Sequence, residues 1–376
     1  MTRLASPALI TDQPALEAML RRVQGRPCLA LDTEANSMYA YTERVCLIQI
    51  SLPGADYLID PLSQSIDVSA LRGVFADASV EKVFHACEYD VISLRRDYGF
   101  TFAHLFDTMW AARILGWPHV GLADILQERF GVRLDKRWQR FNWGQRPLPP
   151  EALAYARLDT HYLIRLRELQ MRELRRMDRL EEAQEVFADL AQAEAAPRED
   201  DNGDGFWRVK GVYDLKPPAR AVLRELCLYR DGEARRIDRP PFKVVGDTAL
   251  IEIARRGPTH IDQLRGVPGM SEGQIARHGA HLVHAVARGQ KAPPPRPPAR
   301  RSIDRAVLDR YERLREWRKT AAAQRGVDAD VVISNAALMA LARKRPRSED
   351  DLDGVDGLGP WRRRTYGKAI LEVLNS

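Results

Sequence analysis

The first 170 residues of the chain alternate short apolar runs with amphipathic stretches. Four apolar runs rich in Val, Ile and Leu have the length of strands, at 29–32, 45–51, 56–60 and 80–85. The pair Pro53-Gly54 predicts a turn between the second and third runs. Helical periodicity is found at 89–96, 107–115 and 121–130, and a long charged helix is expected at about 150–195. This alternation predicts an α/β domain built on a mixed sheet.

Beyond residue 206 the pattern changes to helices separated by Pro and Gly turns, without obvious strands. The acidic stretch 199–205 has the composition of a linker, and 289–301 contains five prolines among basic residues, which favours an extended, semi-rigid spacer. We therefore expect a first domain with a trailing helix at 1–195, a small all-helical domain at 206–290, a Pro-rich linker at 291–301 and a second small all-helical domain at 302–376.

The two helical segments repeat each other. Residues 244–270 align without gaps on 332–358, at an offset of 88, with eleven identical pairs. The shared pattern is a helix, a second helix that begins at a proline, and then Leu-x-Gly-Val-x-Gly before a further helix. Only two repeats, each of roughly 80 residues, indicate two small domains rather than a solenoid.

Composition narrows the range of partners and compartments. Hydrophobic residues make up 45% of the 376 positions, enough for packed cores, and the net charge of +6 favours a polyanionic partner without requiring one. The four cysteines are scattered, which argues against a zinc site or a disulfide framework and fits a reducing cytosol. The chain shows neither a leader-like pattern nor an apolar run of membrane-spanning length. We expect a cytoplasmic protein that does not enter a membrane.

Acidic residues supply the candidate chemistry. Asp32 and Glu34 follow an apolar strand and share one side of it, because strand side chains alternate with period two. Tyr155 and Asp159 are four residues apart and share a helix face, and Asp90 lies in an apolar setting between the two pairs. Carboxylates that face one another need a cation or a proton. Such a set can hold two divalent ions that activate a water and stabilise a leaving oxygen, with the Tyr155 phenol orienting the water.

Each of these residues also has an ordinary structural explanation. A single acid is most often a helix cap or a solvated side chain, and Asp90 could pair with Arg95 or Arg96. Tyr155 alone is more often a half-buried core aromatic. The metal-site hypothesis therefore depends on all the pieces occurring together in one α/β domain.

Three segments together resemble a known family. They are Leu-Asp-Thr-Glu at 31–34, Phe-His-Ala-Cys-Glu-Tyr-Asp at 84–90 and Tyr-Ala-Arg-Leu-Asp at 155–159. They are similar to the three exonuclease motifs of the DEDD superfamily, tyrosine branch, and most closely to those of the ribonuclease D family. The strand at 45–50 and the segment at 134–148 extend the resemblance, and the repeated helical units resemble tandem HRDC domains. The likeness covers nearly the whole chain.

The resemblance implies a ribonuclease H-like catalytic domain and a 3′-to-5′ exoribonuclease. Such an enzyme trims the 3′ ends of tRNA precursors and other structured RNAs and releases 5′-mononucleotides with two Mg²⁺ or Mn²⁺ ions. Carried over by position, the metal ligands are Asp32, Glu34, Asp90 and Asp159, and Tyr155 positions the nucleophilic water. The family also leads us to expect a monomer.

Other positions are expected to support the site. Asp107, His85 and Arg146 are candidates for supporting the ligands or contacting substrate, and for Asp107 we favour orientation of the site over direct ligation. The chain departs from the family pattern at Ala35, where relatives often have Phe, and at 141–142, where Phe-Asn replaces a small residue and Asp. Neither departure touches a ligand, but the grip on the last nucleotide could differ.

The basic region around the second linker suggests an RNA-binding face. Arg300, Arg301, Tyr311 and Trp317 combine phosphate-binding cations with rings on which bases can stack. A solvated helix with internal ion pairs explains the same pattern nearly as well. Two other functions compete with an exoribonuclease: a DNA 3′-to-5′ exonuclease, and an RNA-binding protein with a decayed nuclease domain. A helicase is excluded because the sequence has no phosphate-binding Gly-x4-Gly-Lys loop.

Overall fold

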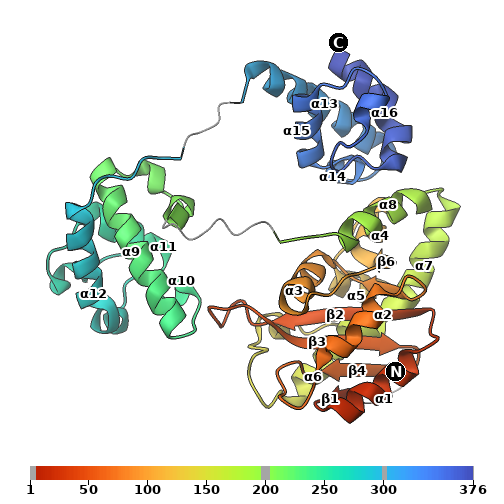
Figure 1. The fold of residues 1–376 in the computed structure, drawn as a ribbon, viewed down its shortest axis with the longest axis horizontal. Helices are drawn as coiled ribbons and strands as arrows, with labels where there is room; N and C mark the ends of the chain where they lie inside the picture. Colours follow the sequence, from red (N-terminus) through yellow and green to blue (C-terminus); the bar gives the residue numbers. More distant parts are fainter. Residues whose placement is uncertain (1–5, 196–203, 299–302, 376) are drawn as a thin grey trace. The chain divides into compact units, whose positions relative to one another are not determined.

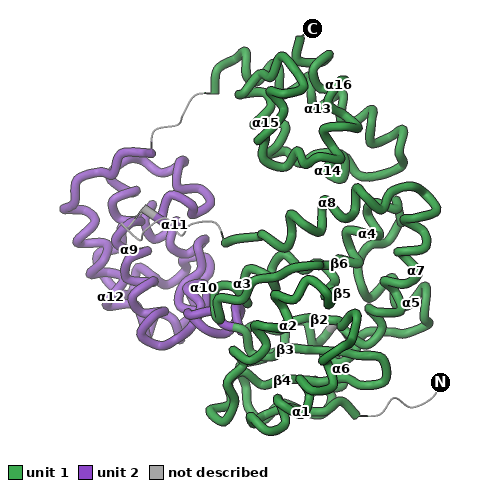
Figure 2. The backbone as a smooth tube through the Cα atoms, turned by 45° about the vertical axis from the view of Figure 1, so that its right-hand side comes forward, with its two compact units in different colours: residues 1–35, 45–195, 302–376 green, residues 36–44, 196–301 purple. Residues whose placement is uncertain are grey.

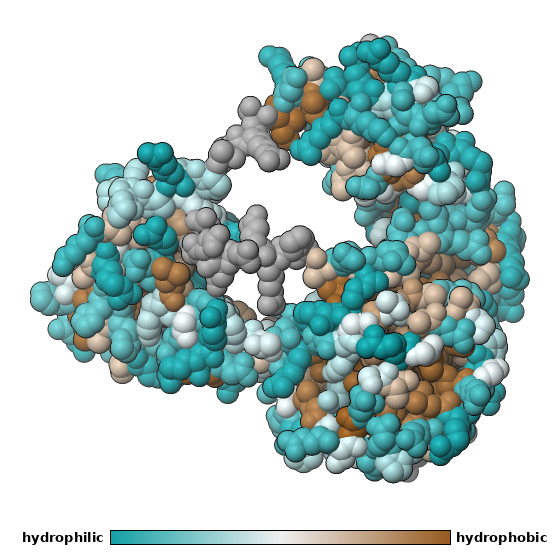
Figure 3. Space-filling view, in the orientation of Figure 1, coloured by the Kyte–Doolittle hydropathy of each residue, from teal (hydrophilic) through white to brown (hydrophobic). Residues whose placement is uncertain are grey.

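The computed structural model describes residues 6–195, 204–298 and 303–375 (Figure 1). Contacts divide the chain into two compact units (Figure 2). Unit 1 comprises residues 1–35, 45–195 and 302–376, and unit 2 comprises residues 36–44 and 196–301. In the space-filling view, surface hydrophobic residues gather on the part of unit 1 drawn at the lower right (Figure 3). Among the described residues, no helix is both long and apolar enough to cross a membrane.

Unit 1 contains a six-stranded mixed sheet. Its strands are β1 (Ala8–Ile10), β2 (Cys28–Ala35), β3 (Val45–Leu52), β4 (Ala55–Ile59), β5 (Glu81–Phe84) and β6 (Leu105–Asp107). They lie in the order β1-β4-β3-β2-β5-β6, and β3 runs antiparallel to both of its neighbours while the other pairs are parallel. The central strand β3 is buried at every position, including the polar residues Gln49 and Ser51. The predicted turn is present between β3 and β4, where Gly54 adopts a φ of 82°.

Helices flank the sheet. They are α1 (Gln13–Val23), α2 (Arg72–Ala76), α3 (Glu88–Tyr98), α4 (Thr108–Leu115), α5 (Leu122–Phe130), α6 (Pro150–His161), α7 (Leu163–Arg176) and α8 (Leu180–Ala191). Short 3₁₀ turns η1 (Val68–Leu71) and η2 (Lys136–Arg140) complete this part. The prediction of one helix at 150–195 is wrong. The chain turns at Tyr162 and again near Asp178, whose φ of 53° is incompatible with a continuing right-handed helix.

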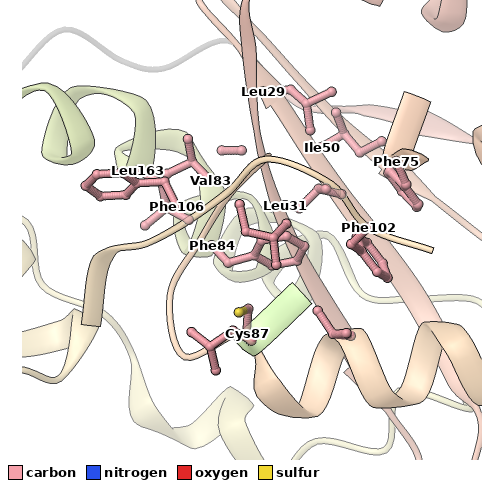
Figure 4. Packing of buried hydrophobic residues seen from close by; sticks show 14 of the residues in the cluster. Leu29, Leu31, Ile50, Phe75, Val83, Phe84, Cys87, Phe102, Phe106 and Leu163 are labelled. Carbon is pink, nitrogen blue, oxygen red and sulfur yellow. The ribbon is translucent and has the colours of Figure 1, made fainter. Parts of the chain in front are cut away.

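Two apolar clusters hold the sheet and its helices together. The main core contains Leu29, Leu31, Phe84 and Phe106, which Figure 4 shows from close by. A smaller cluster joins β3 and β4 to α6 through residues that include Leu47, Leu58, Trp143, Ala152 and Tyr155. This second cluster fixes the position of α6 over the sheet, so the helix that carries Tyr155 and Asp159 has little freedom to move.

Two helical bundles follow the same plan. The first contains α9 (Pro217–Arg236), α10 (Pro241–Val244), α11 (Asp247–Arg256) and α12 (Glu272–Lys291), after short turns η3 (Asp204–Arg208) and η4 (Val212–Asp214). The second contains α13 (Arg305–Arg325), α14 (Ala329–Val332), α15 (Asn335–Lys344) and α16 (Pro360–Asn375). The turns η5 (Ile261–Leu264) and η6 (Asp350–Leu352) also correspond. Each helix of the second bundle begins 88 residues after its counterpart, which agrees with the sequence repeat.

The second bundle contacts the sheet-containing part of unit 1 through α8. Three acidic residues of α8 pair with three arginines of the bundle: Glu181 with Arg364, Glu182 with Arg325, and Glu185 with Arg362. The Glu182 side chain is fully buried and accepts hydrogen bonds of 2.8 and 2.5 Å from the Arg325 guanidinium. The Glu185 and Arg362 side chains are each 7% exposed, whereas Glu181 and Arg364 are both more than half exposed.

Candidate active site

Strand β2 presents two carboxylates toward α6. In the β2–β3 register Asp32 lies opposite Gln49 and Glu34 lies opposite Leu47, and residues paired in this way share a face of the sheet. Leu47 belongs to the apolar cluster that includes Tyr155 of α6. The period-two prediction therefore places both acids on the face that α6 covers.

Asp90 comes from the first turn of α3, where it is 6% exposed. Thr33, between the two acids of β2, donates its hydroxyl to Asp90 Oδ1 at 2.5 Å. This hydrogen bond links the second motif to the first and fixes the orientation of the Asp90 carboxylate. The alternative pairing of Asp90 with Arg95 is not present in the described residues, since Arg95 donates to backbone carbonyls of residues 191–193.

Burial and neighbouring carboxylates raise the pKa values of these four acids. Burial raises the pKa of Asp32 well above its usual value, and Asp90, Asp159 and Glu34 raise it further. Burial also raises the pKa of Glu34, again with contributions from Asp159 and Asp90. The pKa of Asp159 rises to about 8 through burial and the charge of Asp90. Burial raises the pKa of Asp90 to about 7, against the hydrogen bond from Thr33, which lowers it. These effects show that acids from three elements share one region.

Tyr155 lies in the same electrostatic environment. Burial raises the pKa of its phenol far above the usual value, and the charges of Asp159, Glu34 and Asp32 raise it further. The phenol therefore stays protonated and can act as a hydrogen-bond donor but not as a base. Gln139, from η2, hydrogen-bonds to the phenol and holds the ring at its polar end.

The donor set suits hard divalent cations. It consists of carboxylate oxygens only, and no lysine or arginine contributes to the pKa shifts of these four acids. Within the described ranges, no three His, Cys, Asp or Glu side chains lie close enough together to form a ready ion-binding group. The ligand assignment therefore stays a prediction, supported by the electrostatic coupling and by the chemistry of the donors.

Asp107 and His85 form hydrogen bonds at the starts of α3 and α4. Asp107 is completely buried, accepts from the Cys87 backbone N–H at 2.7 Å, and caps α4 by accepting from the N–H groups of Met109 and Trp110. The His85 Nδ1 lies 2.9 Å from the Thr108 hydroxyl, and burial lowers the pKa of His85 to about 4. These contacts fix the start of α3, on which Asp90 lies, and give Asp107 a positioning role.

Arg146 is occupied by structural contacts. Its guanidinium donates to both oxygens of Asp60 at 2.6 and 2.7 Å, and to the backbone carbonyls of Trp143, Gln145 and Cys46. The arginine thus ties the segment before α6 to the sheet. It is not available to bind a substrate phosphate without losing these bonds.

The structure describes only two of the four predicted RNA-binding residues, Tyr311 and Trp317. Arg300 and Arg301 lie outside the described residues. Tyr311 and Trp317 pack against the core of the second bundle, and Trp317 makes an edge contact with Tyr366 at 5.7 Å between ring centroids. The alternation of arginines and aromatic rings on α13 therefore reflects core packing at these two positions. Their role in RNA binding stays a prediction.

The sequence patterns did not single out three polar residues at this site. Thr33 and Gln139 have the contacts described above, and Gln49 lies directly opposite Asp32. Gln49 is fully buried, and neither polar atom of its side chain has a hydrogen-bond partner among the described residues. A polar residue in the middle of an otherwise apolar buried strand was the available signal for Gln49.

Comparison with known proteins places these features in a family. Residues 7–175 match a family described as 3′-5′ exonuclease, and residues 219–286 and 307–374 each match the HRDC domain. The chain is 30% identical to ribonuclease D of Jannaschia sp. (strain CCS1) over 98% of this chain and 95% of that protein. It is 29% identical to ribonuclease D of Pseudomonas paraeruginosa (strain DSM 24068 / PA7), over 98% and 97% of the two chains.

A solved structure is similar over the full length. The crystal structure of Escherichia coli RNase D, described as an exoribonuclease involved in structured RNA processing, matches with a TM-score of 0.70 and 25% identity. The match covers 99% of both chains. The two HRDC matches are also offset by 88 residues, in agreement with the internal repeat.

Proposed function

Since the chain belongs to the ribonuclease D family and is a 3′-to-5′ exoribonuclease, we propose that the carboxylate cluster of β2, α3 and α6 is its catalytic centre. Exonucleases of this family typically use divalent metal ions. The residues proposed to hold two Mg²⁺ or Mn²⁺ ions are Asp32, Glu34, Asp90 and Asp159. The observation that supports this assignment most directly is that carboxylates from three separate elements raise the pKa values of Asp32, Glu34 and Asp159.

The side chains divide the work. Two divalent ions held by Asp32, Glu34, Asp90 and Asp159 would activate a water and stabilise the leaving 3′ oxygen of an in-line displacement. The Tyr155 phenol, which stays protonated, donates a hydrogen bond that positions the attacking water. Gln139 orients the phenol, and Thr33 orients the Asp90 carboxylate. Asp107 fixes the start of α3 without touching the reacting atoms.

The proposed substrates are 3′ ends of tRNA precursors and other structured RNAs, released as 5′-mononucleotides. The processing of structured RNA by the Escherichia coli relative supports this choice. We also propose that the protein acts as a monomer, as the family likeness leads us to expect. A location in the cytoplasm is proposed because its four cysteines are free. The domain division at 1–195, 206–290 and 302–376 with a linker at 291–301 is part of the same proposal, and the two HRDC matches support it.

A timed digestion tests the assignment. A tRNA with a 3′ extension is incubated with the parent chain, with Asp159→Asn and with Glu151→Gln, in Mg²⁺, Mn²⁺ or EDTA, and product lengths are resolved. Glu151 is the matched control, because it is an exposed acid on the same helix. We expect stepwise 3′ shortening by the parent and the control, none in EDTA, and none by Asp159→Asn despite unchanged RNA binding. Equal turnover by Asp159→Asn would refute the site, and equal rates on a DNA strand would refute the choice of RNA.

A further inference from the structure

A groove of about 1000 Å³ lies in unit 1 beside α6. Residues of α6, the start of α7, the end of α5 with the loop after it, and the segment at residues 6–7 line it. The residues important for its chemistry are Phe130, Arg133, Arg157, His161, Tyr162 and Arg165. None of them belongs to the proposed catalytic centre.

The groove and the catalytic centre use opposite faces of one helix. An α-helix turns by about 100° per residue, so Arg157 lies about 200° around α6 from both Tyr155 and Asp159. Tyr155 packs toward the sheet with the apolar cluster of β3 and β4, whereas Arg157 lines the groove. A ligand in the groove therefore cannot compete directly with a scissile bond held at the acids.

The charge of the groove is one-sided. Arg133, Arg157 and Arg165 line it, and no Asp or Glu is among the lining residues that the structure describes. His161, which also lines the groove, is paired with Asp56, whose carboxylate lies 2.8 Å from the His161 Nδ1. The groove is thus suited to an anionic ligand.

Aromatic and apolar groups complete the lining. The Phe130 and Tyr162 rings stack at 5.3 Å between centroids, and the Arg165 guanidinium lies 5.1 Å from the centre of the Phe130 ring. This packing holds the guanidinium in place before any ligand arrives, which lowers the entropy lost on binding. Leu153 and Leu158 add apolar surface. An anion with planar, partly apolar groups fits this combination better than an inorganic ion does.

We propose that this groove, here named the α6 groove, is a second RNA-binding site that holds the substrate strand away from its 3′ end. Arg133 and Arg165 bind backbone phosphates, and the apolar wall receives a base or ribose. RNA is favoured over an acidic peptide because the chain already acts on RNA. The volume of the groove also exceeds what one small inorganic anion fills. The inference rests on action on RNA and is independent of the metal-ligand assignment.

Equilibrium binding in EDTA tests it, because no hydrolysis can occur there. The full chain carrying Arg133→Glu and Arg165→Glu is compared with a control carrying Arg172→Glu and Arg176→Glu, which reverses two exposed charges farther along α7. Fluorescence anisotropy is recorded with a labelled single-stranded RNA of about 20 nucleotides at several salt concentrations. We expect a Kd at least roughly tenfold higher for the groove variant and a salt slope smaller by about 1.4, since each lost phosphate contact removes about 0.7.

Further measurements decide whether the proposal holds. In Mg²⁺, the ratio of kcat/KM for the long RNA to that for a trinucleotide should fall by about tenfold in the groove variant only. Equal weakening by both double variants, or none by either, overturns the proposal. Binding of uridine 5′-monophosphate that the groove variant loses, with unchanged RNA affinity, identifies a mononucleotide site and also overturns it.

The milder Arg133→Gln, Arg165→Gln variant replaces the charge reversal if the latter fails to fold. Loss of digestion in Asp159→Asn with intact groove binding separates this test from that of the catalytic centre.

Discussion

The ion pairs between α8 and the second helical bundle give a graded prediction. Replacing Glu182 by Gln leaves the Arg325 guanidinium without its charged partner at a position where the acid is fully buried. Removing one member of a buried pair costs about 3–5 kcal/mol, because the remaining charge stays desolvated. Glu185→Gln should cost a similar amount, since Arg362 is equally enclosed. Glu181→Gln should cost about 0–1 kcal/mol, because that pair is exposed to water and salt.

Amide hydrogen exchange measured by mass spectrometry is the assay. A loss of about 3 kcal/mol of docking free energy should speed the exchange of α8 and of the end of α13 by roughly 10²-fold, if opening is fast and reversible. The Glu181→Gln variant is the internal control, because it alters a neighbouring pair on the same helix. A double-mutant cycle of Glu182→Gln with Arg325→Gln should give a coupling of about 2 kcal/mol or more, against at most about 0.5 kcal/mol for Glu181 with Arg364.

Two results would refute this reasoning. Similar small effects of Glu181→Gln and Glu182→Gln would mean that burial of the pair does not hold in solution. Fast exchange of α8 in the unmodified chain would mean that the second bundle does not stay on this surface. In either case the arginines of the bundle would be free for other contacts.

Three other predictions concern the proposed catalytic centre. Tyr155→Phe should lower kcat by about 10²–10³-fold, the usual loss for one positioned donor, while stabilisation by added Mn²⁺ stays unchanged in thermal denaturation. Because the pKa values of Asp90 and Asp159 are raised in the folded state, their contribution to stability is full below the unfolded pKa near 4 and is lost as the pH rises through about 7 and 8. In EDTA, the parent should therefore lose more stability between pH 5.5 and 8.5 than Asp159→Asn does, and an equal loss would contradict the shift. Asp107→Ala should destabilise by roughly 2–4 kcal/mol in urea unfolding, because α4 loses its cap and the Cys87 N–H loses its acceptor.

The sequence predicted those features that depend on the spacing of neighbouring residues along one strand or helix. The period-two alternation of β2 was enough to place Asp32 and Glu34 on one face, and the spacing of four was enough for Tyr155 and Asp159. The helix at 150–195 was predicted wrongly because charged, amphipathic periodicity continues on both sides of Tyr162 and Asp178, and no Pro or Gly marks the two breaks. β1 and β6 escaped prediction because three residues are too few to show a period.

Contacts between distant segments were out of reach of the sequence. Arg325 and Glu182 are separated by 143 positions, and neither residue differs in local context from a solvated surface charge. The same holds for Arg146 and Asp60. Arg146 was a candidate for supporting the ligands or contacting substrate, but in the structure it pairs with Asp60 and has a structural role. Thr33 escaped notice because its role depends on a helix that begins more than fifty residues later.

The tandem repeat has a consequence for how the two HRDC copies can be used. At the positions of the first copy that correspond to Arg325 and Arg362, the chain has Ile237 and Gln274. The first copy therefore lacks the cations that anchor its sibling to α8. The two copies therefore have the same fold but different contacts. If their order were exchanged, the acids of α8 would lose the arginines with which they pair. One copy cannot replace the other in the contact with α8.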